Sequence, residues 1–579
     1  MSTISAAPES DHRRGLRPAQ AAAWAVLLTL LALLLVAAVT ADRSGWPSLV
    51  GDEATYLMQA ESVAWDFDLR YTRGDHDRFV ALHGTPPEGL ILQSGDRGRH
   101  ISYGKPFFYA LYTAPFTRLA PVHGPLVANA LLLALAAVLA ARALRRTMGA
   151  SAPLWTAFAI FGSVAFAYVF WVHSDLFLTS LTAIALALLV DGERRGAGRW
   201  ILAGALLAVV AYSRPMYGFL FLPAILAVPR DRWRRFLPLL VAGALAVVLA
   251  AAAVHQSLTG SWTSYGASRR GFYSYTGFPG VDFPAAAWHE NLEEWGDHAW
   301  LRPSHLGRKK IVASLWGWNS LYYLAGRHVG LLPYFLPALL AFAGRPRGAF
   351  RYGLVAAVAL GVAAFLWLRP FNFWGGGGAI ANRYFLPLFA ACWFLPSRPL
   401  RAWWIAAAAA VAALFLYPLW LRPSAFPLWD GEGFHYVSSV ARALPYETTQ
   451  SHLKPSGQED VRHHGLWIKF LDRGVGAVRD GELLRLRDGG GVLLVGSEEP
   501  LAVLELELRD GGDAELVVEG GEVRVLPSPG RWRKYSIVLD GPRARHPMWW
   551  TWEPFYLYRL RLTLVGASGP VAARLRTAS

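Results

Sequence analysis

The chain has 579 residues, of which 54% are hydrophobic and 25 are tryptophan, and its mean hydropathy is +0.28. This composition excludes an ordinary soluble domain and predicts a membrane protein. The net charge of +15 does not predict a nucleic-acid partner, because the arginines recur in small clusters between apolar runs and form no single basic face. The only cysteine, Cys392, lies in an apolar run, which excludes a disulfide framework and a cysteine-based metal site.

The first apolar run, residues 21–39, follows a basic N-terminal tail of residues 1–20. It is longer than the usual signal-peptide core of about 7 to 15 residues, so we expect it to remain as a transmembrane helix. Further apolar runs predict about eleven spans in total. Three of these runs are short for a bilayer, so the number of spans could differ from eleven by two. The further runs centre near residues 133, 162, 183, 206, 222, 246, 336, 359, 390 and 411, and the short ones are 176–190, 200–212 and 216–228.

The arginine clusters predict the orientation of these spans. They fall in alternate loops, which the positive-inside rule places in the cytoplasm together with the N-terminus. The clusters occupy residues 142–146, 194–199, 230–235, 345–351 and 398–401. The long segments, residues 41–123, 256–327 and everything after 421, are then expected outside, together with the short loop 369–383.

The first outer segment, residues 41–123, contains two adjacent carboxylates, Asp52 and Glu53, about ten residues beyond the first span. Ionised groups are costly beside hydrocarbon unless they have a task or a partner, so these residues are candidates for catalysis; the alternative is a solvated turn. Helical spacing of apolar residues from Tyr56 to Phe67 predicts a helix that lies on the bilayer surface. A second interfacial helix is expected at residues 107–119.

The composition changes after residue 421. Residues 422–490 are predicted to be an extracytoplasmic linker with short helices, and His463-His464 in it lacks further ligands, so no metal is assigned. Seven short β-rich runs in residues 491–579 predict a small all-β sandwich that is a possible glycan-binding domain. Its tryptophans are expected to pack in the core rather than stack on sugars; these are Trp532, Trp549, Trp550 and Trp552.

Together these features resemble the GT-C glycosyltransferases, in particular the protein O-mannosyltransferase and aminoarabinose transferase branch. The resemblance rests on Asp52-Glu53 after the first span, on the two interfacial helices and on Lys105-Pro106 before the second of them. It implies a polytopic α-helical GT-C domain over residues 21–421. It also implies transfer of a sugar from a polyprenyl-phosphate donor to an acceptor hydroxyl on a glycan, protein or lipid, at the outer face of a bacterial cytoplasmic membrane.

The resemblance implies roles for three of these residues. Asp52 would be the general base of a direct attack that inverts the anomeric carbon. Glu53 would orient the acceptor or face solvent, and Lys105 would contact the donor phosphate. Gly104 stands where some relatives have an acid, which leaves a requirement for a divalent cation undetermined; no other cofactor is expected.

Further candidates lie at the predicted outer ends of helices. Arg214, Arg327 and Arg383 are candidate phosphate ligands, or else mark the membrane interface or a flexible loop. Asp175 is a candidate second carboxylate that positions the acceptor, or else caps a helix. Candidates for contacts to the acceptor or sugar are Tyr56, Tyr103, His173 and Asn382.

Two other classes of function compete with this interpretation. A lipid or sugar transporter or flippase would show ionisable residues within its spans or two matching interrupted halves, and neither is evident. A non-catalytic membrane protein that binds envelope glycan would make Asp52 expendable. The sequence does not identify the sugar or the acceptor.

Overall fold

The computed structural model describes most of the helical part of the chain and the strands of its C-terminal part. The described residues are 9–42, 49, 51–87, 89–96, 98–190, 196–272, 278–281, 313–370, 372–376, 379–427, 434–445, 447, 450, 461–463, 466–470, 475–477, 484–486, 491–497, 500–509, 514–518, 522–525, 531–539, 544–547, 554–567 and 571–578.

The chain divides into two compact units. The first comprises residues 1–296, 331–365 and 380–425, and the second comprises residues 297–330, 366–379 and 426–579. The α-helices are α1 Glu9–Thr40, α2 Asp52–Trp65, α3 Arg73–His83, α4 Phe108–Leu119, α5 Gly124–Met148, α6 Ala152–Phe161, α7 Ser174–Val190, α8 Gly198–Ser213, α9 Phe221–Leu226, α10 Trp233–Thr259, α12 Ala313–Ala325, α13 Leu331–Tyr334, α14 Leu336–Leu340, α15 Ala349–Leu368, α16 Leu386–Cys392 and α17 Ala402–Leu421. The 3-10 helices used below are η2 Val164–Phe170, η3 Pro215–Leu220 and η8 Ala341–Gly344.

Several helices of the described chain are apolar enough to cross a membrane, as the composition predicts. By length and composition there are five such stretches among the described residues. They are Pro18–Thr40, Gly124–Phe161, Arg230–Thr259, Ala349–Leu368 and Ala402–Leu421. The three runs expected to be short are short, as α7, α8 and the pair η3 and α9. The expected runs near residues 336 and 390 are broken into α13, α14, η8 and α16, so the number of spans stays a prediction.

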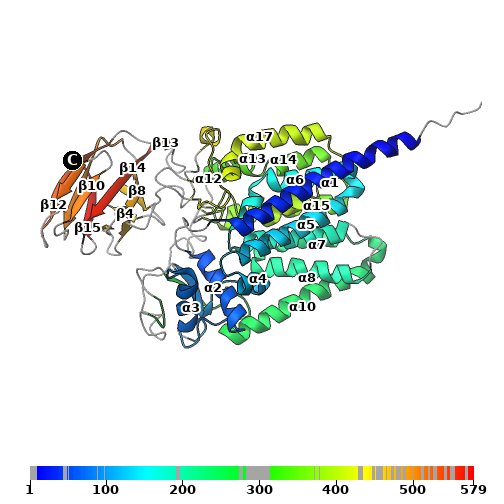
Figure 1. Ribbon diagram of the computed structural model, residues 1–579, viewed down its shortest axis with the longest axis horizontal. Coiled ribbons are helices and arrows are strands. Elements are labelled where there is room, and N and C mark those ends of the chain that lie inside the picture. Colours follow the sequence, from blue (N-terminus) through cyan, green and yellow to red (C-terminus); the bar gives the residue numbers. More distant parts are fainter. Residues whose placement is uncertain are drawn as a thin grey trace, which may run out of the picture. The chain divides into compact units, whose positions relative to one another are not determined.

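Within the first unit, α5, α7, α8 and α10 pack side by side in that order (Figure 1). The backbones of α8 and α10 approach each other closely at two glycines. A Cβ atom on Gly204 would lie 2.0 Å from the carbonyl oxygen of Leu240, and one on Gly243 would lie 1.9 Å from that of Ile201. Small residues at such a contact allow helices in a bilayer to gain van der Waals packing.

Both helices expected in the first outer segment are present, as α2 and α4. However, α2 ends at Trp65, and Phe67 lies beyond it with φ of 58° and 89% of its surface exposed. The helix is also buried on nearly all sides, from Glu53 to Ser62, rather than along one apolar face.

The polar residues that follow α2 form structure that packs against this helix. They contain α3, which starts with a capping box between Thr72 and Asp75. They also contribute two strands to a three-stranded antiparallel sheet with the order β2-β1-β3. Its strands are β1 Leu90–Ser94, β2 Ser102–Tyr103 and β3 Ser268–Phe272.

The C-terminal part of the second unit contains two antiparallel sheets whose facing apolar side chains form one core. The strand orders are β11-β10-β14-β8-β5-β4, with β13 on β14, and β12-β9-β15-β7-β6. The strands are β4 Val461–His463, β5 Leu466–Phe470, β6 Val475–Ala477, β7 Leu484–Leu486, β8 Gly491–Ser497, β9 Val503–Arg509, β10 Glu515–Val518, β11 Glu522–Val525, β12 Arg533–Val538, β13 Ala544–Pro547, β14 Pro554–Val565 and β15 Val571–Thr577.

All seven β-rich runs predicted in residues 491–579 are strands, but the predicted start of the β domain was wrong. Four strands, β4 to β7, lie inside the segment 422–490 and pair with strands of the domain. Three of them have only three residues each, too few for alternation to be recognised.

The prediction that Trp532 packs in the core of the β domain was wrong. Its ring is half-buried outside the core cluster, with the guanidinium carbons of Arg509 and Arg574 at 4.9 and 4.2 Å from its centroid. The other three tryptophans of that prediction and His464 lie outside the described residues.

Candidate active site

Asp52 is the first residue of α2. Gly51 before it has φ of 60°, a conformation that favours glycine, and this turn leads directly into the helix. Carboxylates in the first turn of a helix interact favourably with its dipole. Both Asp52 and Glu53 therefore occupy positions that stabilise their ionised forms.

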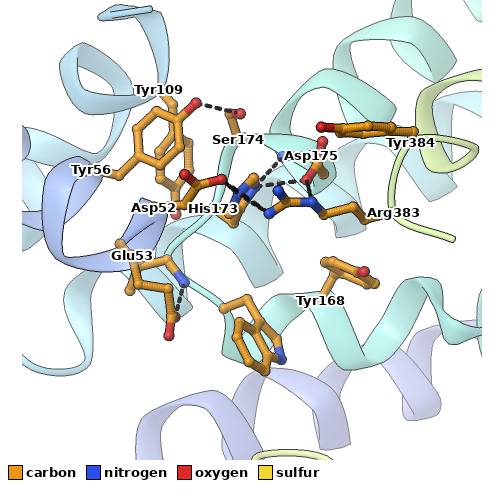
Figure 2. Close-up of polar contacts among 12 residues, drawn as sticks. Asp52, Glu53, Tyr56, Tyr109, Tyr168, His173, Ser174, Asp175, Arg383 and Tyr384 are labelled. Carbon is orange, nitrogen blue, oxygen red and sulfur yellow. Dashed lines mark hydrogen bonds and ion pairs between the residues drawn. The ribbon is translucent and has the colours of Figure 1, made fainter. Parts of the chain in front are cut away.

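The carboxylate of Asp52 contacts three basic side chains from distant parts of the chain (Figure 2 shows two of them). Its Oδ1 pairs with Nζ of Lys105, which follows β2. Its Oδ2 lies 2.8 Å from Nε2 of His173 and 3.0 Å from Nη1 of Arg383. The base candidate and two of the predicted phosphate ligands therefore meet at one point.

His173 lies between two carboxylates. Its Nε2 faces Asp52, and its Nδ1 lies 2.7 Å from Oδ2 of Asp175, a fully buried residue in the first turn of α7. The other oxygen of Asp175 lies 2.6 Å from Nη1 of Arg214. A chain of polar contacts thus runs from Lys105 through Asp52, His173 and Asp175 to Arg214.

Arg383 and Arg214 are held by the ring of Tyr384 as well as by carboxylates. Figure 2 shows Arg383 and Tyr384. The guanidinium carbons lie 5.5 Å and 4.6 Å from the ring centroid. Such cation–π contacts contribute about 0.5 to 2 kcal/mol each. Tyr384 was not among the residues predicted from the sequence, because an aromatic residue beside an arginine is ordinary in a membrane protein.

The pKa values of Asp52 and Lys105 reflect this environment. Burial acts to raise the pKa of Asp52, but Lys105, Arg383 and His173 together hold it well below its usual value. Burial lowers the pKa of Lys105 to about 7, with a further contribution from the nearby Arg269, although Asp52 opposes the shift. Asp52 is therefore ionised at neutral pH, whereas Lys105 is close to losing its charge.

Buried hydrogen bonds position the two loops that carry His173 and Arg383. Glu53 accepts a hydrogen bond of 2.9 Å from the backbone N–H of Val172, next to His173. Asn129 donates to the carbonyl oxygen of Trp171 at 2.8 Å. The hypothesis that Glu53 faces solvent was therefore wrong, because its side chain is buried against this loop.

The loop that carries Arg383 is anchored on both sides. The hydroxyl of Tyr168 donates to the carbonyl oxygen of Ile380 at 2.6 Å, and that of Tyr217 donates to the carbonyl oxygen of Tyr384 at 3.0 Å. Ala381 between them has φ of 50°, a conformation that costs a residue with a Cβ about 1 to 3 kcal/mol. Such local strain is typical of functional loops.

Most of the predicted site residues come together, and some do not. Those in the cluster are Asp52, Tyr56, Lys105, His173, Asp175, Arg214 and Arg383, with the Tyr56 hydroxyl 2.8 Å from Oγ of Ser174. Tyr103 packs instead against Tyr71, with ring centroids 6.1 Å apart. Asn382 accepts a hydrogen bond from the backbone N–H of Phe385 through its Oδ1. We find no contact that brings either residue to Asp52.

Arg327 belongs to the second unit. Its guanidinium donates to the carbonyl oxygens of Arg442 at 2.6 Å and Leu444 at 3.4 Å. Next to it, the fully buried Glu447 accepts hydrogen bonds from the backbone N–H groups of His328 and Val329, at 2.7 and 3.0 Å. These contacts indicate a structural role for this part of the chain and give no support to Arg327 as a phosphate ligand.

Three residues near Lys105 were missed from the sequence. Ser102 and Arg269 both pair with Gln93 across the sheet of β1 to β3, so the three side chains share one face. Within the part of the chain that the structure describes, each has a buried polar atom without a hydrogen-bond partner, namely Oε1 of Gln93, Oγ of Ser102 and Nε of Arg269. The pairing joins residues far apart in the sequence, so local patterns could not reveal this set.

Gly104 explains why this site lacks a further carboxylate. A Cβ atom there would lie 3.0 Å from Cγ2 and 3.1 Å from the carbonyl oxygen of Ile91, so an acidic side chain would not fit without a shift. Among the described residues, no group of three or more His, Cys, Asp and Glu side chains is arranged to hold a metal ion.

The described chain combines helices long and apolar enough to cross a membrane with a cation-rich carboxylate cluster. It was compared with protein families, curated proteins and solved structures. No protein-family model and no curated protein matches the chain. Among solved structures, the chain is similar to ArnT from Cupriavidus metallidurans bound to undecaprenyl phosphate, with 15% identity and a TM-score of 0.36. The match covers 69% of this chain and 61% of that one.

Two more solved structures are similar. The apo state of the same ArnT gives 17% identity and a TM-score of 0.38, over 70% of this chain and 62% of that chain. The apo oligosaccharyltransferase from Archaeoglobus fulgidus gives 13% identity and a TM-score of 0.36, over 69% of this chain and 55% of that chain. The chain thus spans about three fifths of the length of the ArnT chains.

Proposed function

We propose that this protein is an inverting glycosyltransferase that moves a sugar from a polyprenyl-phosphate donor to an acceptor hydroxyl, with Asp52 as the general base. The observation that carries the proposal is the contact of one half-buried carboxylate, that of Asp52, with Lys105 and Arg383, two cations suited to a phosphate. All residues of the cluster come from segments that the arginine distribution predicts to face outward. The cytoplasmic membrane of a bacterium is the proposed location.

The balance of charge supports an anionic ligand. At Asp52 two cations, Lys105 and Arg383, converge on one carboxylate. Arg269 adds another cation near Lys105, and its buried Nε has no hydrogen-bond partner among the described residues. Bringing these like charges together is unfavourable unless an anion binds among them, and a phosphate with its several acceptor oxygens fits this requirement.

The same contacts explain how Asp52 can act as a base. A carboxylate held at a low pKa by cations is ionised but weakly basic. When the donor phosphate takes Lys105 and Arg383 as ligands, Asp52 loses two stabilising contacts and becomes more basic. It can then accept the proton of the acceptor hydroxyl as the oxygen attacks the anomeric carbon, a contribution of about 100- to 10,000-fold in rate. The polyprenyl phosphate leaves from the opposite face, so the anomeric carbon inverts.

The sugar of the donor would lie beside its phosphate. Gln93 and Ser102 share the sheet face with Arg269, and each has a buried polar atom that no described residue hydrogen-bonds. Sugar hydroxyls can both donate to and accept from such groups. We propose these two residues as sugar ligands, and a glycan, protein or lipid hydroxyl as the acceptor.

Binding of undecaprenyl phosphate tests the proposal. Native mass spectrometry of the purified protein should detect this lipid, and the double variant Lys105→Ala, Arg383→Gln should lose it. Arg327→Gln, a variant outside the cluster, should retain it. In proteoliposomes a glycosyltransferase separates the sugar from its carrier, whereas a flippase moves the donor intact. A donor that crosses the bilayer unchanged, with no free polyprenyl phosphate formed, would contradict the proposal.

A further inference from the structure

One face of the five-stranded sheet of the β domain carries a tryptophan between two arginines. Alternation along β9 and β15 directs their apolar side chains into the core, so Arg509 and Arg574 stand on the opposite face. The ring centroid of Trp532, just before β12, lies 4.9 Å from the guanidinium carbon of Arg509 and 4.2 Å from that of Arg574. A guanidinium group that stacks on an aromatic ring can still bind a carboxylate through its N–H groups.

The arginines of this face are weakly neutralised by the acidic side chains beside them. Oε2 of Glu507 lies 4.0 Å from Nη1 of Arg574 and 3.8 Å from Nη2 of Arg576. Both distances are too long for hydrogen bonds. The second acid of this face, Glu505, pairs with Lys534. Arg574 and Arg576 thus share one distant carboxylate, which leaves them able to bind a further anion.

The same two arginines have donors that the described residues do not use. Nε of Arg574 and Nε of Arg576 are buried and have no hydrogen-bond partner within the described part of the chain. The side chains are nonetheless accessible, since 27% of the surface of Arg574 and 41% of that of Arg576 are exposed. A small turn of either side chain would present its planar fork to a carboxylate, which accepts two parallel hydrogen bonds from it.

The spacing of these cations favours a chain of acidic groups over a single ion. Arg574 and Arg576 are two residues apart on β15, which places their Cα atoms about 7 Å apart on one face. One carboxylate satisfies one arginine fork, whereas a polymer with an acidic group on successive units engages several forks and gains avidity. Trp532 is half-buried, and the exposed part of its ring is a flat apolar surface against which a sugar ring can pack.

We propose that this face of the β domain binds an acidic polysaccharide through its carboxylate groups. The binding residues are Arg509, Trp532, Arg574 and Arg576. A lipid surface fits less well, because docking on a bilayer requires several apolar side chains that insert, and Val538 is the only strongly exposed large apolar residue described on β9, β12 and β15. All residues of this site belong to the second unit, so the inference does not rest on the proposed transfer reaction.

Binding of the full-length protein, held in phosphatidylcholine nanodiscs, to immobilised polygalacturonate tests the inference. The parent should bind this uronate polymer with an affinity that falls as salt is added, and should not bind dextran, which is neutral. Arg574→Gln should raise the Kd at least about fivefold. Arg533 is exposed and pairs with Leu508, a core residue, so its register position belongs to the other face. Arg533→Gln removes the same charge and should change the Kd by less than about twofold.

Substitution of Trp532 separates a shaped site from a general basic surface. Trp532→Ala leaves every charge in place but removes the ring that supports two arginines, so the Kd should rise at least about threefold. Trp532→Phe keeps an aromatic face and should restore most of the affinity. Each variant should melt at the temperature of the parent, which shows that the domain is still folded.

Several results would overturn the inference. A parent that does not bind polygalacturonate, or binds dextran equally well, would exclude an acidic-glycan site. Equal Kd values for Arg574→Gln and Arg533→Gln would exclude this face as the site. Polyphosphate that binds as tightly as polygalacturonate would show that charge alone is recognised. Binding to phosphatidylglycerol vesicles without affinity for polygalacturonate would make the partner a membrane instead.

Discussion

The affinity of this protein for its donor should fall as the pH rises above about 7, because Lys105 loses its charge there. Burial lowers its pKa from the ordinary value of 10.5 to about 7, so the charged form that binds phosphate is present below pH 7 and is lost above it. A charge-assisted hydrogen bond contributes about 1.5 to 3 kcal/mol. This corresponds to a loss of about 10- to 150-fold in affinity when Lys105 is neutral.

The assay is the Kd of a short-chain polyprenyl-phosphate sugar, measured by calorimetry in nanodiscs between pH 6 and 9. The phosphodiester keeps one charge over this range, so the profile reports the protein. Bound phosphate favours the charged lysine, which shifts the decline somewhat above pH 7. Lys105→Arg should bind with a flat profile, because its guanidinium stays charged. Lys105→Ala should be weak and flat. A flat profile for the parent, or unaltered affinity in Lys105→Ala, would refute this account of Lys105.

Three further predictions concern other parts of the chain. Arg269→Ala should weaken donor binding by at least about tenfold, because one charge-assisted contact to the phosphate is lost, and should leave the melting temperature unchanged. Equal donor Kd values for the parent and the variant would show that Arg269 does not bind the donor. Glu447→Ala should lower the melting temperature more than Glu447→Gln, because each buried N–H group left without an acceptor costs about 1 to 3 kcal/mol. Equal melting temperatures of the two variants would contradict a structural role of the Glu447 side chain as a hydrogen-bond acceptor. A reporter fused after Ser579 should be active only if exported, and one inserted near Arg195 only in the cytoplasm; the opposite pattern would reverse the predicted topology.

The sequence was informative where chemistry is local. Two carboxylates just beyond a span indicated Asp52, and the resemblance to a known family implied Lys105; the two residues are in contact in the structure. Apolar spacing identified α2, an aromatic-rich segment identified α4, and alternation identified the longer strands of the β domain. In each case the signal lies within one stretch of chain.

The remainder depends on contacts between distant segments, which periodicity does not encode. The position of His173 between two aspartates depends on how α2 and α7 meet, and Gln93 joins Arg269 only through strand pairing. Arg327 was predicted as a phosphate ligand because its contacts with a distant segment could not be seen in the sequence. Its place before an apolar run suggested the membrane interface, whereas its side chain is bonded to backbone carbonyls.

The most direct test of the central claim is the single-turnover rate of sugar transfer by Asp52→Asn, with the anomeric configuration of the product determined by NMR. The substitution keeps the shape of the side chain and removes the base, so transfer should fall by at least about 100-fold. The donor should bind at least as tightly, since Asp52 no longer competes for Lys105 and Arg383, and the residual product should be inverted. Full activity of Asp52→Asn, or a product that retains the configuration of the donor, would contradict the assignment of Asp52 as the base.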